Sequence, residues 1–321
     1  MKLVAAISFG ILAFLAVGSE PVRAAAAPPL PLSVSSRQWR PLNQTWNRGL
    51  QAQLDRALQR RALWRSLIES EKMAVAVVDL ADPKAPRFAQ VNGGVMMYGA
   101  SLPKLAILLA ACRSFDDGSL RETPQVMADL KDMIRLSDNA AASRVTARLG
   151  LEKIEALLLN PRYQFYDPFK GGGIWLGSGY APGGERQPEP LQGLLHAVTA
   201  NQVCRFYYLL AYGRLLRPAR SRQMLEILSC PQLHDKFVQV LEPAMPGTRL
   251  FRKSGEWRRF HLDSILVWGE PWRRYILVCL VEHEQGEKIL QEIVPVVEDL
   301  LRVRPLKSQP WSRGTALPPE K

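Results

Sequence analysis

The hydrophobic periodicity changes twice along this chain, and this order of patterns limits the possible folds more than any other feature. Apolar residues recur at helical spacing over 44–70, and a β-branched run follows at Met73–Leu80. Helical patterns fill the middle, strand patterns return after Pro246, and a last helical pattern covers 287–302. Strands separated in this way can still share one sheet. We therefore expect an α+β fold of three layers (α/β/α), in which terminal helices flank an antiparallel sheet and an all-helical domain is inserted.

The first residues have the pattern of a secretory signal peptide, which we place at residues 1–24. Lys2 gives a positive start, Leu3–Val17 is an apolar run, and small residues around Ala24 offer a cleavage site. A membrane-spanning helix needs about 20 apolar residues, so this shorter run favours cleavage over an uncleaved anchor. We expect a periplasmic or secreted protein with no membrane span after signal cleavage.

The other boundaries follow changes in composition. Residues 25–40 are rich in Ala, Pro and Ser and predict a flexible leader, while the Pro-rich stretch 305–321 predicts a disordered tail. Between them we expect one folded domain, 41–304. Its α/β part comes from 41–100 and 248–304, and its helical part from 101–247.

Within this domain, the patterns predict the individual elements. The strands are expected at 73–80, 88–91, 248–253, 263–268 and 274–281. One helix is expected to begin at Ser101. Further helices are expected at 127–136, 140–159, 200–212, 218–228 and 287–302. The glycine-rich stretch 161–190 predicts a long loop.

Ser101 and Lys104 form the first chemical signal, an S-x-x-K motif at a predicted helix start. Residues three apart on a helix share a face, so the Lys104 amine can reach the Ser101 hydroxyl. A serine nucleophile needs an adjacent base, and a partly buried lysine can lose its proton and act as one. A single match of this kind also fits a solvated serine and lysine on a helix.

Two further motifs follow. An S-D-N triplet occupies 137–139, where a helix-capping turn is the alternative interpretation. A K-S-G triplet occupies 253–255, where an edge-strand lysine before a turn is the alternative. Together, S-x-x-K, S-D-N and K-[ST]-G in this order are the set associated with penicillin-recognising serine enzymes.

On these motifs the sequence resembles the serine β-lactamase and penicillin-binding protein superfamily, and class A β-lactamases most. The similarity covers about 73–301 and includes the helix that leads into the S-D-N triplet. It implies a β-lactamase/transpeptidase-like fold and an acyl-enzyme mechanism that needs no cofactor. It also implies the catalytic roles: Ser101 is the acylated nucleophile, Lys104 the proton acceptor or relay, and Ser137 the proton donor to the departing ring nitrogen.

The resemblance assigns the substrate-binding residues as well. Asn139 would hold the side-chain amide of the substrate, and Lys253 and Ser254 its carboxylate. The oxyanion hole would consist of the backbone N–H groups of Ser101 and of Glu256, which follows Gly255.

The sequence departs from class A enzymes in two places. The interval from Ser101 to Ser137 is shorter than these enzymes usually show, which predicts a trimmed helical domain. In addition, their deacylation depends on a glutamate in an E-x-x-L-N loop, and no such motif follows the S-D-N triplet. Asp167 and Glu185 flank the glycine-rich stretch and are the two candidates to replace it. Glu256 adds a carboxylate near Lys253, for which Arg258 and Arg259 could compensate or could be exposed strand-end charges.

The composition limits partners and cofactors. The formal net charge of +12 is compatible with an anionic substrate, but most of it has no explanation in the motifs. The four His show no metal-ligand spacing, so we expect no metal site. Cys204 and Cys230 could pair in an oxidising compartment. We expect a monomer that binds a small-molecule β-lactam or a peptidoglycan stem peptide, and no nucleic acid.

The leading hypothesis is therefore an exported serine hydrolase that opens β-lactam rings through a Ser101 acyl-enzyme. One alternative is a peptidase, or penicillin-binding protein, that acts on the D-Ala-D-Ala end of peptidoglycan stems. Another is a non-hydrolytic module that binds or senses β-lactams or muropeptides. All three would keep the motif set. The missing glutamate favours the two alternatives, and the S-D-N segment favours the hydrolase.

Overall fold

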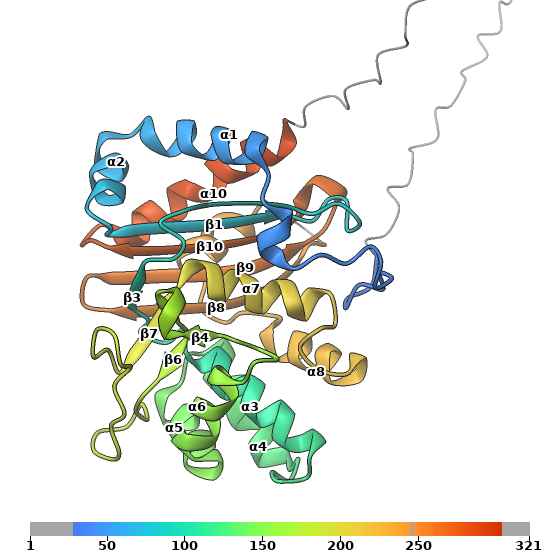
Figure 1. Cartoon of the computed structure of the whole chain (residues 1–321), viewed down its shortest axis with the longest axis vertical. Helices are drawn as coiled ribbons and strands as arrows, with labels where there is room; N and C mark the ends of the chain where they lie inside the picture. Colours follow the sequence, from blue (N-terminus) through green and yellow to red (C-terminus); the bar gives the residue numbers. More distant parts are fainter. Residues whose placement is uncertain (1–27, 245–246, 304–321) are drawn as a thin grey trace, which may run out of the picture.

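A five-stranded antiparallel sheet lies at the centre of the protein (Figure 1). The computed structural model describes residues 28–244 and 247–303; the expected signal peptide and tail lie outside these residues. The strand order is β2 (Arg87–Val91), β1 (Met73–Asp79), β10 (Arg274–Glu282), β9 (Phe260–Trp268) and β8 (Arg249–Trp257). Strands from the two ends of the chain thus pair directly, with Met73 opposite Val281. The fold is the predicted one.

One face of the sheet is covered by helices from both ends of the chain. These are α1 (Arg48–Gln59), α2 (Ala62–Glu69) and α10 (Gly286–Arg302), which lie together on one side in Figure 1. Successive side chains of a strand point to opposite faces, so Val75 and Val77 pack into this layer while Ala74 and Ala76 pack into the other. Both faces of β1 are therefore buried, which explains its continuous apolar run.

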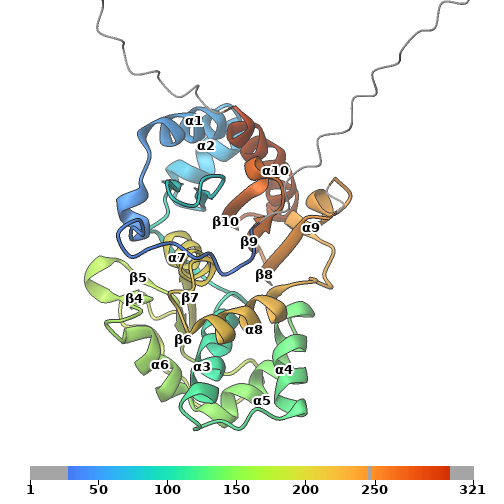
Figure 2. The same ribbon diagram turned by 90° about the vertical axis from the view of Figure 1, so that its right-hand side faces the viewer.

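The opposite face carries α7 (Ala200–Ala211) and, beyond it, the helical part of the molecule. This part contains α3 (Lys104–Asp116), α4 (Pro124–Arg135), α5 (Asn139–Leu149), α6 (Leu151–Leu159) and α8 (Pro218–Leu228), gathered in the lower half of Figure 2. The helix α3 is buried on nearly all sides, which its apolar sequence from Leu105 to Cys112 permits. A buried helix is a rigid support, and the candidate nucleophile lies just before its first residue.

Short elements connect the two parts. The strands β3 (Met96–Tyr98), β7 (His196–Thr199) and β6 (Trp175–Leu176) form a small sheet, and β4 (Tyr166–Asp167) pairs with β5 (Gly172–Gly173). The helix α9 (Lys236–Leu241) lies against β9 and α10. Three 3₁₀ segments complete the described elements: η1 (Leu42–Thr45), η2 (Pro168–Lys170) and η3 (Pro271–Arg273).

Several element boundaries differ from the sequence prediction. The predicted helix 140–159 divides at Gly150, whose φ of 81° ends α5 and precedes α6. Residues 101–103 form a turn, so α3 begins at Lys104 rather than at Ser101. The strand β8 continues to Trp257, so the K-S-G triplet lies inside a strand.

The part of the expected leader that the structure describes packs on the domain. Leu30 and Leu32 are buried, and the Leu32 N–H donates to the carbonyl of Ala211 (2.7 Å). This contact joins Leu32 to the end of α7. Over 28–244 and 247–303, none of the helices combines the length and the apolarity that a membrane span requires.

Candidate active site

Ser101 lies in the turn that joins the small sheet to α3. The preceding residue, Ala100, has a φ of 45°, a left-handed conformation that is costly for a residue with a Cβ. The Tyr180 hydroxyl donates to the Ala100 carbonyl (3.0 Å), and this hydrogen bond links the turn to the loop that contains Tyr180. A strained residue such as Ala100 persists only where the surrounding structure fixes it. Here it directly precedes Ser101, which is half-buried.

Lys104 is fully buried, and its amine contacts both serines of the motif set. Its Nζ atom lies 3.0 Å from Ser101 Oγ, 2.6 Å from the Ser137 carbonyl oxygen and 2.7 Å from Asn139 Oδ1. Burial lowers the pKa of Lys104 to about 7, and the nearby Asp138 carboxylate opposes this shift only in part. A neutral amine has two N–H donors, and the carbonyl oxygens of Ser137 and Asn139 can accept both. The lone pair is then left for the Ser101 hydroxyl.

Ser137 links Lys104 to Lys253. The Lys253 Nζ atom donates to Ser137 Oγ (2.8 Å) and to the Ser254 carbonyl (2.6 Å). Ser137 has a φ of 58°, and the following Asp138 caps α5 by accepting from the Ala141 N–H (2.5 Å). The capping alternative for the S-D-N triplet thus holds for Asp138, while Ser137 faces the two lysines. Burial and the charge of Lys104 lower the pKa of Lys253 well below its usual value.

The strand β8 passes close to Ser101 at Gly255. A Cβ added to Gly255 would lie 3.0 Å from the Ser101 nitrogen and 3.1 Å from the Gly99 carbonyl oxygen, both backbone atoms. A side chain at this position would push the two backbones apart by a few tenths of an ångström, and glycine avoids this displacement. The edge of β8 and the turn before α3 therefore form the two walls of one site.

The Glu256 carboxylate pairs with a cation on α9. Its Oε2 atom accepts from Lys236 Nζ (2.8 Å), and Lys236 is buried between Glu256 and Asp235. His261 lies farther away, with Nδ1 3.8 Å from the same oxygen. The compensating cation is therefore Lys236. Neither arginine of the 258–259 turn pairs with Glu256 among the described contacts, since Arg258 stacks on Trp257 and Arg259 faces Glu282 (3.7 Å).

The two candidate deacylation residues lie outside this cluster. Asp167 accepts from the Phe169 N–H (3.0 Å) and pairs with Lys170 (3.0 Å), and it lines a separate cavity of about 490 Å³ with Asn201 and Arg205. Glu185 is exposed and accepts from Gln187 (2.5 Å). Among the contacts of residues 28–244 and 247–303, neither carboxylate touches Ser101 or Lys104.

Comparison with known proteins places these features in a family. A sequence model described as the Beta-lactamase enzyme family matches residues 125–299, which is more than half of the chain. The chain belongs to this family. Among the curated proteins, none matches its sequence significantly.

Solved structures of the β-lactamase fold resemble it at low identity. A β-lactamase from Sphaerobacter thermophilus DSM 20745 has 15% identity and a TM-score of 0.58, covering 78% of this chain and 95% of its own. A class A representative from Bacteroides cellulosilyticus DSM 14838 has 17% identity and a TM-score of 0.58, covering 79% and 99%. A mutant of PBP-A, solved as an acyl-enzyme complex with penicillin G, has 16% identity and a TM-score of 0.60, covering 82% of this chain and 99% of its own. These likenesses show the fold.

Two residues of the site in this Beta-lactamase family member escaped the sequence analysis. Tyr180 places its ring centroid 4.4 Å from Lys104 Nζ, and His196 stacks on that ring with centroids 4.5 Å apart. Neither residue belongs to a motif. The only sequence signal is an aromatic residue between the glycines of a loop, and such a residue more often packs in a core.

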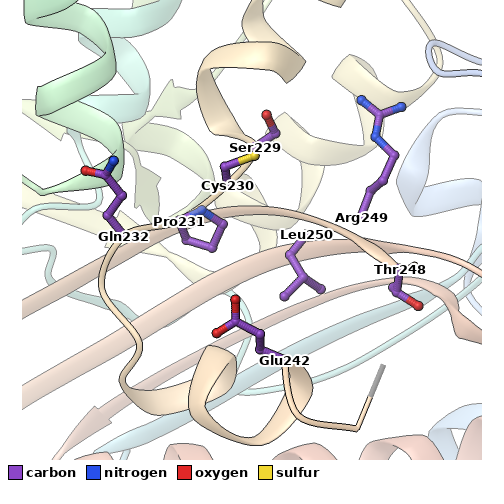
Figure 3. Close-up of a pocket in the computed structure, with 8 residues that line it drawn as sticks. All are labelled: Ser229, Cys230, Pro231, Gln232, Glu242, Thr248, Arg249 and Leu250. Carbon is purple, nitrogen blue, oxygen red and sulfur yellow. The ribbon is translucent and has the colours of Figure 1, made fainter. Parts of the chain in front are cut away.

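A further cavity of about 590 Å³ lies at the start of β8, away from the motif residues (Figure 3). Cys230 and Leu250 are among the side chains that line it in this figure. Cys230 is exposed and Cys204 is buried in α7, and both thiols are free, so the pairing considered from the sequence does not form. No three His, Cys, Asp or Glu side chains of the described ranges gather as a metal site would require.

Proposed function

We propose that the protein is a penicillin-recognising serine hydrolase whose Ser101 opens β-lactam rings by forming an acyl-enzyme. One observation carries this proposal: the Lys104 amine lies 3.0 Å from Ser101 Oγ while two carbonyl oxygens occupy its N–H groups. A nucleophile within hydrogen-bond distance of an oriented base is the arrangement that acyl transfer requires.

The proposed acylation moves one proton around the site. Lys104 Nζ accepts the Ser101 hydroxyl proton as Oγ bonds to the β-lactam carbonyl carbon. The ring C–N bond then breaks, and the ring nitrogen takes a proton from the Ser137 hydroxyl. Lys104 returns its proton to Ser137 Oγ, which lies 3.4 Å from its Nζ atom. The amine ends neutral, and the product is a Ser101 ester with a ring-opened amine.

The substrate-binding residues keep the roles that the resemblance assigns to them. We assign the substrate carboxylate to Lys253 and Ser254, since the buried Lys253 amine ends at the shared Ser137 hydroxyl. We assign the side-chain amide of the substrate to Asn139. The oxyanion would bind to the backbone N–H groups of Ser101 and Glu256, which the close approach at Gly255 supports. Because Glu256 is paired with Lys236, its carboxylate does not oppose an anionic substrate here.

A penicillin-binding role, with action on D-Ala-D-Ala stem ends, is the second candidate. The contacts of Asp167 and Glu185 support it, because among the described contacts each carboxylate binds its own loop and neither touches Ser101 or Lys104. A mutant of PBP-A, which has the same fold, was solved as an acyl-enzyme complex with penicillin G. We further propose export, on the signal-peptide pattern of residues 1–24.

Intact-mass spectrometry of the mature protein mixed with penicillin G separates these functions. A transient adduct with accumulating ring-opened product supports a β-lactamase, and a persistent adduct supports the penicillin-binding role. Ser101→Ala is the control, and we expect it to carry no adduct. An adduct that still forms in Ser101→Ala contradicts the assignment of Ser101 as the nucleophile. If the unchanged protein binds penicillin G reversibly and forms no adduct, only the sensing alternative remains.

A further inference from the structure

Tyr180 belongs to no motif, yet it contacts Lys104 and the residue that precedes Ser101. It lies in the loop between β6 and β7, and the centroid of its ring is 4.4 Å from Lys104 Nζ. Its hydroxyl donates to the carbonyl of Ala100, the residue before the nucleophile (3.0 Å). One side chain thus covers the base and fixes the turn that carries Ser101.

The position of Tyr180 is itself fixed. His196 of β7 stacks on its ring at 4.5 Å with an interplanar angle of 20°. The His196 Nε2 atom lies 3.1 Å from the Ser178 carbonyl oxygen and 3.3 Å from Ser178 Oγ, so the imidazole is tied to the same loop. The Gly99 N–H in turn donates to the His196 carbonyl (2.7 Å). Loop, β7 and nucleophile turn form one connected unit.

Several elements around Lys104 present groups to its amine. Ser101 lies before α3, Ser137 lies before α5, and Asn139 is the first residue of α5. The charged or titratable groups that face it are Asp138 beside α5, Lys253 on β8, and His196 and Tyr180 on the β7 side. The polar contacts occupy the amine on the α3 and α5 sides, and Lys253 on β8 acts on it through its charge. The Tyr180 ring covers the side of the Lys104 amine that faces the loop between β6 and β7.

We propose that Tyr180 is a positioning residue for acylation, whose ring closes the Lys104 compartment against water while its hydroxyl fixes the Ser101 turn. It can act in this way only if Ser101 is acylated as proposed above. The reaction then depends on a residue of the glycine-rich loop that lies outside the three motifs. Tyr180 does not touch the reacting atoms; it acts through Lys104.

Two opposite effects of the ring decide what its loss would do. A cation over an aromatic face gains about 0.5–2 kcal/mol, which favours the protonated lysine by at most about 1.5 pKa units. Excluding water disfavours the charged form by up to about 3–5 pKa units. Burial is the main cause of the lowered pKa of Lys104, and the Tyr180 ring lies over one side of the buried amine. We infer that exclusion of water is the larger of the two effects of the ring. Loss of the ring should therefore raise the pKa of Lys104.

The test is the pH profile of Ser101 acylation in Tyr180→Ala and Tyr180→Phe, followed with a fluorescent penicillin between pH 5 and 10. We expect Tyr180→Ala to move the midpoint of the rate upward by about one pH unit or more. Its rate at pH 7 should fall about fivefold or more and recover above pH 9. Tyr180→Phe keeps the ring, so we expect its midpoint to stay within about 0.3 pH units of the unchanged protein.

Tyr163→Ala is the matched control, because Tyr163 is a buried tyrosine that stacks on Phe165 and has no contact with Lys104 among the described residues. It should lower the melting temperature without moving the midpoint. Tyr180→Asn, which also removes the ring, replaces Tyr180→Ala if that variant melts below the assay temperature, with the same expected shift.

An unmoved midpoint in the folded alanine or asparagine variant overturns the role of the ring, as does an equal shift in Tyr180→Phe or Tyr163→Ala. These results leave the proposed function intact as long as Ser101 is still acylated. The absence of any adduct in the unchanged protein, at every pH, contradicts the proposed function itself.

Discussion

Lys104 and Lys253 meet at the same oxygen, the hydroxyl of Ser137. The Nζ–Oγ distances are 3.4 Å for Lys104 and 2.8 Å for Lys253. Two buried ammonium groups this close repel each other, and burial already disfavours both charges. The site therefore favours loss of one proton, and the amine beside Ser101 is positioned to use the resulting lone pair.

The first prediction concerns pH. The pKa of Lys104 is lowered to about 7, so the fraction of neutral base grows as pH rises through 7 and is nearly complete above pH 8. We expect the rate of Ser101 acylation to rise with pH over this range and then to level off. Quenched reactions with a fluorescent penicillin measure it, and a rate that is flat or falls from pH 5 to 8 contradicts the assignment of Lys104.

Lys104→Arg provides the matching test of the base. Arginine keeps the charge but cannot lose its proton, so we expect acylation to fall by about 10²–10⁴-fold at every pH. Lys170→Arg, an exposed lysine at Asp167, is the control and should leave the rate unchanged. Retained acylation in Lys104→Arg would place the proton path elsewhere.

The second prediction concerns Ser137. Ser137→Ala removes the oxygen that joins the two lysines, so the departing ring nitrogen loses its nearest proton donor. We expect acylation to slow by about 10²-fold or more. The control is Ser143→Ala on the neighbouring α5, since the Ser143 hydroxyl is buried without a partner and its loss should not affect the rate. Equal rates for the two variants would argue against a proton transfer through Ser137.

Most of the fold could be predicted because its elements have strong local patterns. The β-branched run that begins at Met73 became β1, and the apolar stripe of 287–302 became α10. The errors occur where one residue overrides a pattern. Gly150 interrupts an otherwise continuous helical period. The short α9 was not predicted, because it begins at the polar residues Asp235 and Lys236 and is too short to show a helical period.

The candidate site divides in the same way. The three motifs predicted that Ser101, Lys104, Ser137 and Lys253 belong to one site, and their side chains lie within hydrogen-bond distance of one another in the structure. Tyr180 and Lys236 approach the site from distant segments, and no local pattern encodes such contacts. Their positions depend on how the loop before β7 and the start of α9 pack against the sheet, which is a tertiary property.

The third prediction concerns the buried ion pair behind the site. Arg252 on β8 donates to Asp263 on β9 (2.7 Å), and the two side chains are 2% and 0% exposed. Asp263 also accepts from the backbone N–H of Phe237 (3.1 Å), which joins α9 to the sheet. Removing Asp263 leaves the buried Arg252 with Asp235 as its remaining carboxylate partner (2.6 Å). The Phe237 N–H also loses its acceptor, so we expect Asp263→Ala to lower the free energy of unfolding by about 2–3 kcal/mol.

Urea unfolding of the purified variants measures this loss. The matched control is Glu292→Ala, which breaks the exposed pair with Arg61 and should cost less than about 1 kcal/mol. A similar small change in Asp263→Ala would mean that the buried network does not support β8, the strand that carries Lys253 and Gly255.

The last prediction concerns Gly255, where β8 passes closest to the nucleophile. An alanine there would place its Cβ 3.0 Å from the Ser101 nitrogen and 3.1 Å from the Gly99 carbonyl oxygen. Backbone atoms on both sides cannot turn away as a flexible side chain would, so the strand and the turn must separate. We expect acylation to slow by about 10²-fold, because small displacements of oxyanion donors are costly. Gly94→Ala is the control, since its added Cβ would meet no atom within 4 Å. Acylation rates from both variants, together with their melting temperatures, test the point: a normal rate in folded Gly255→Ala would exclude the close approach of β8 as a requirement for the chemistry at Ser101.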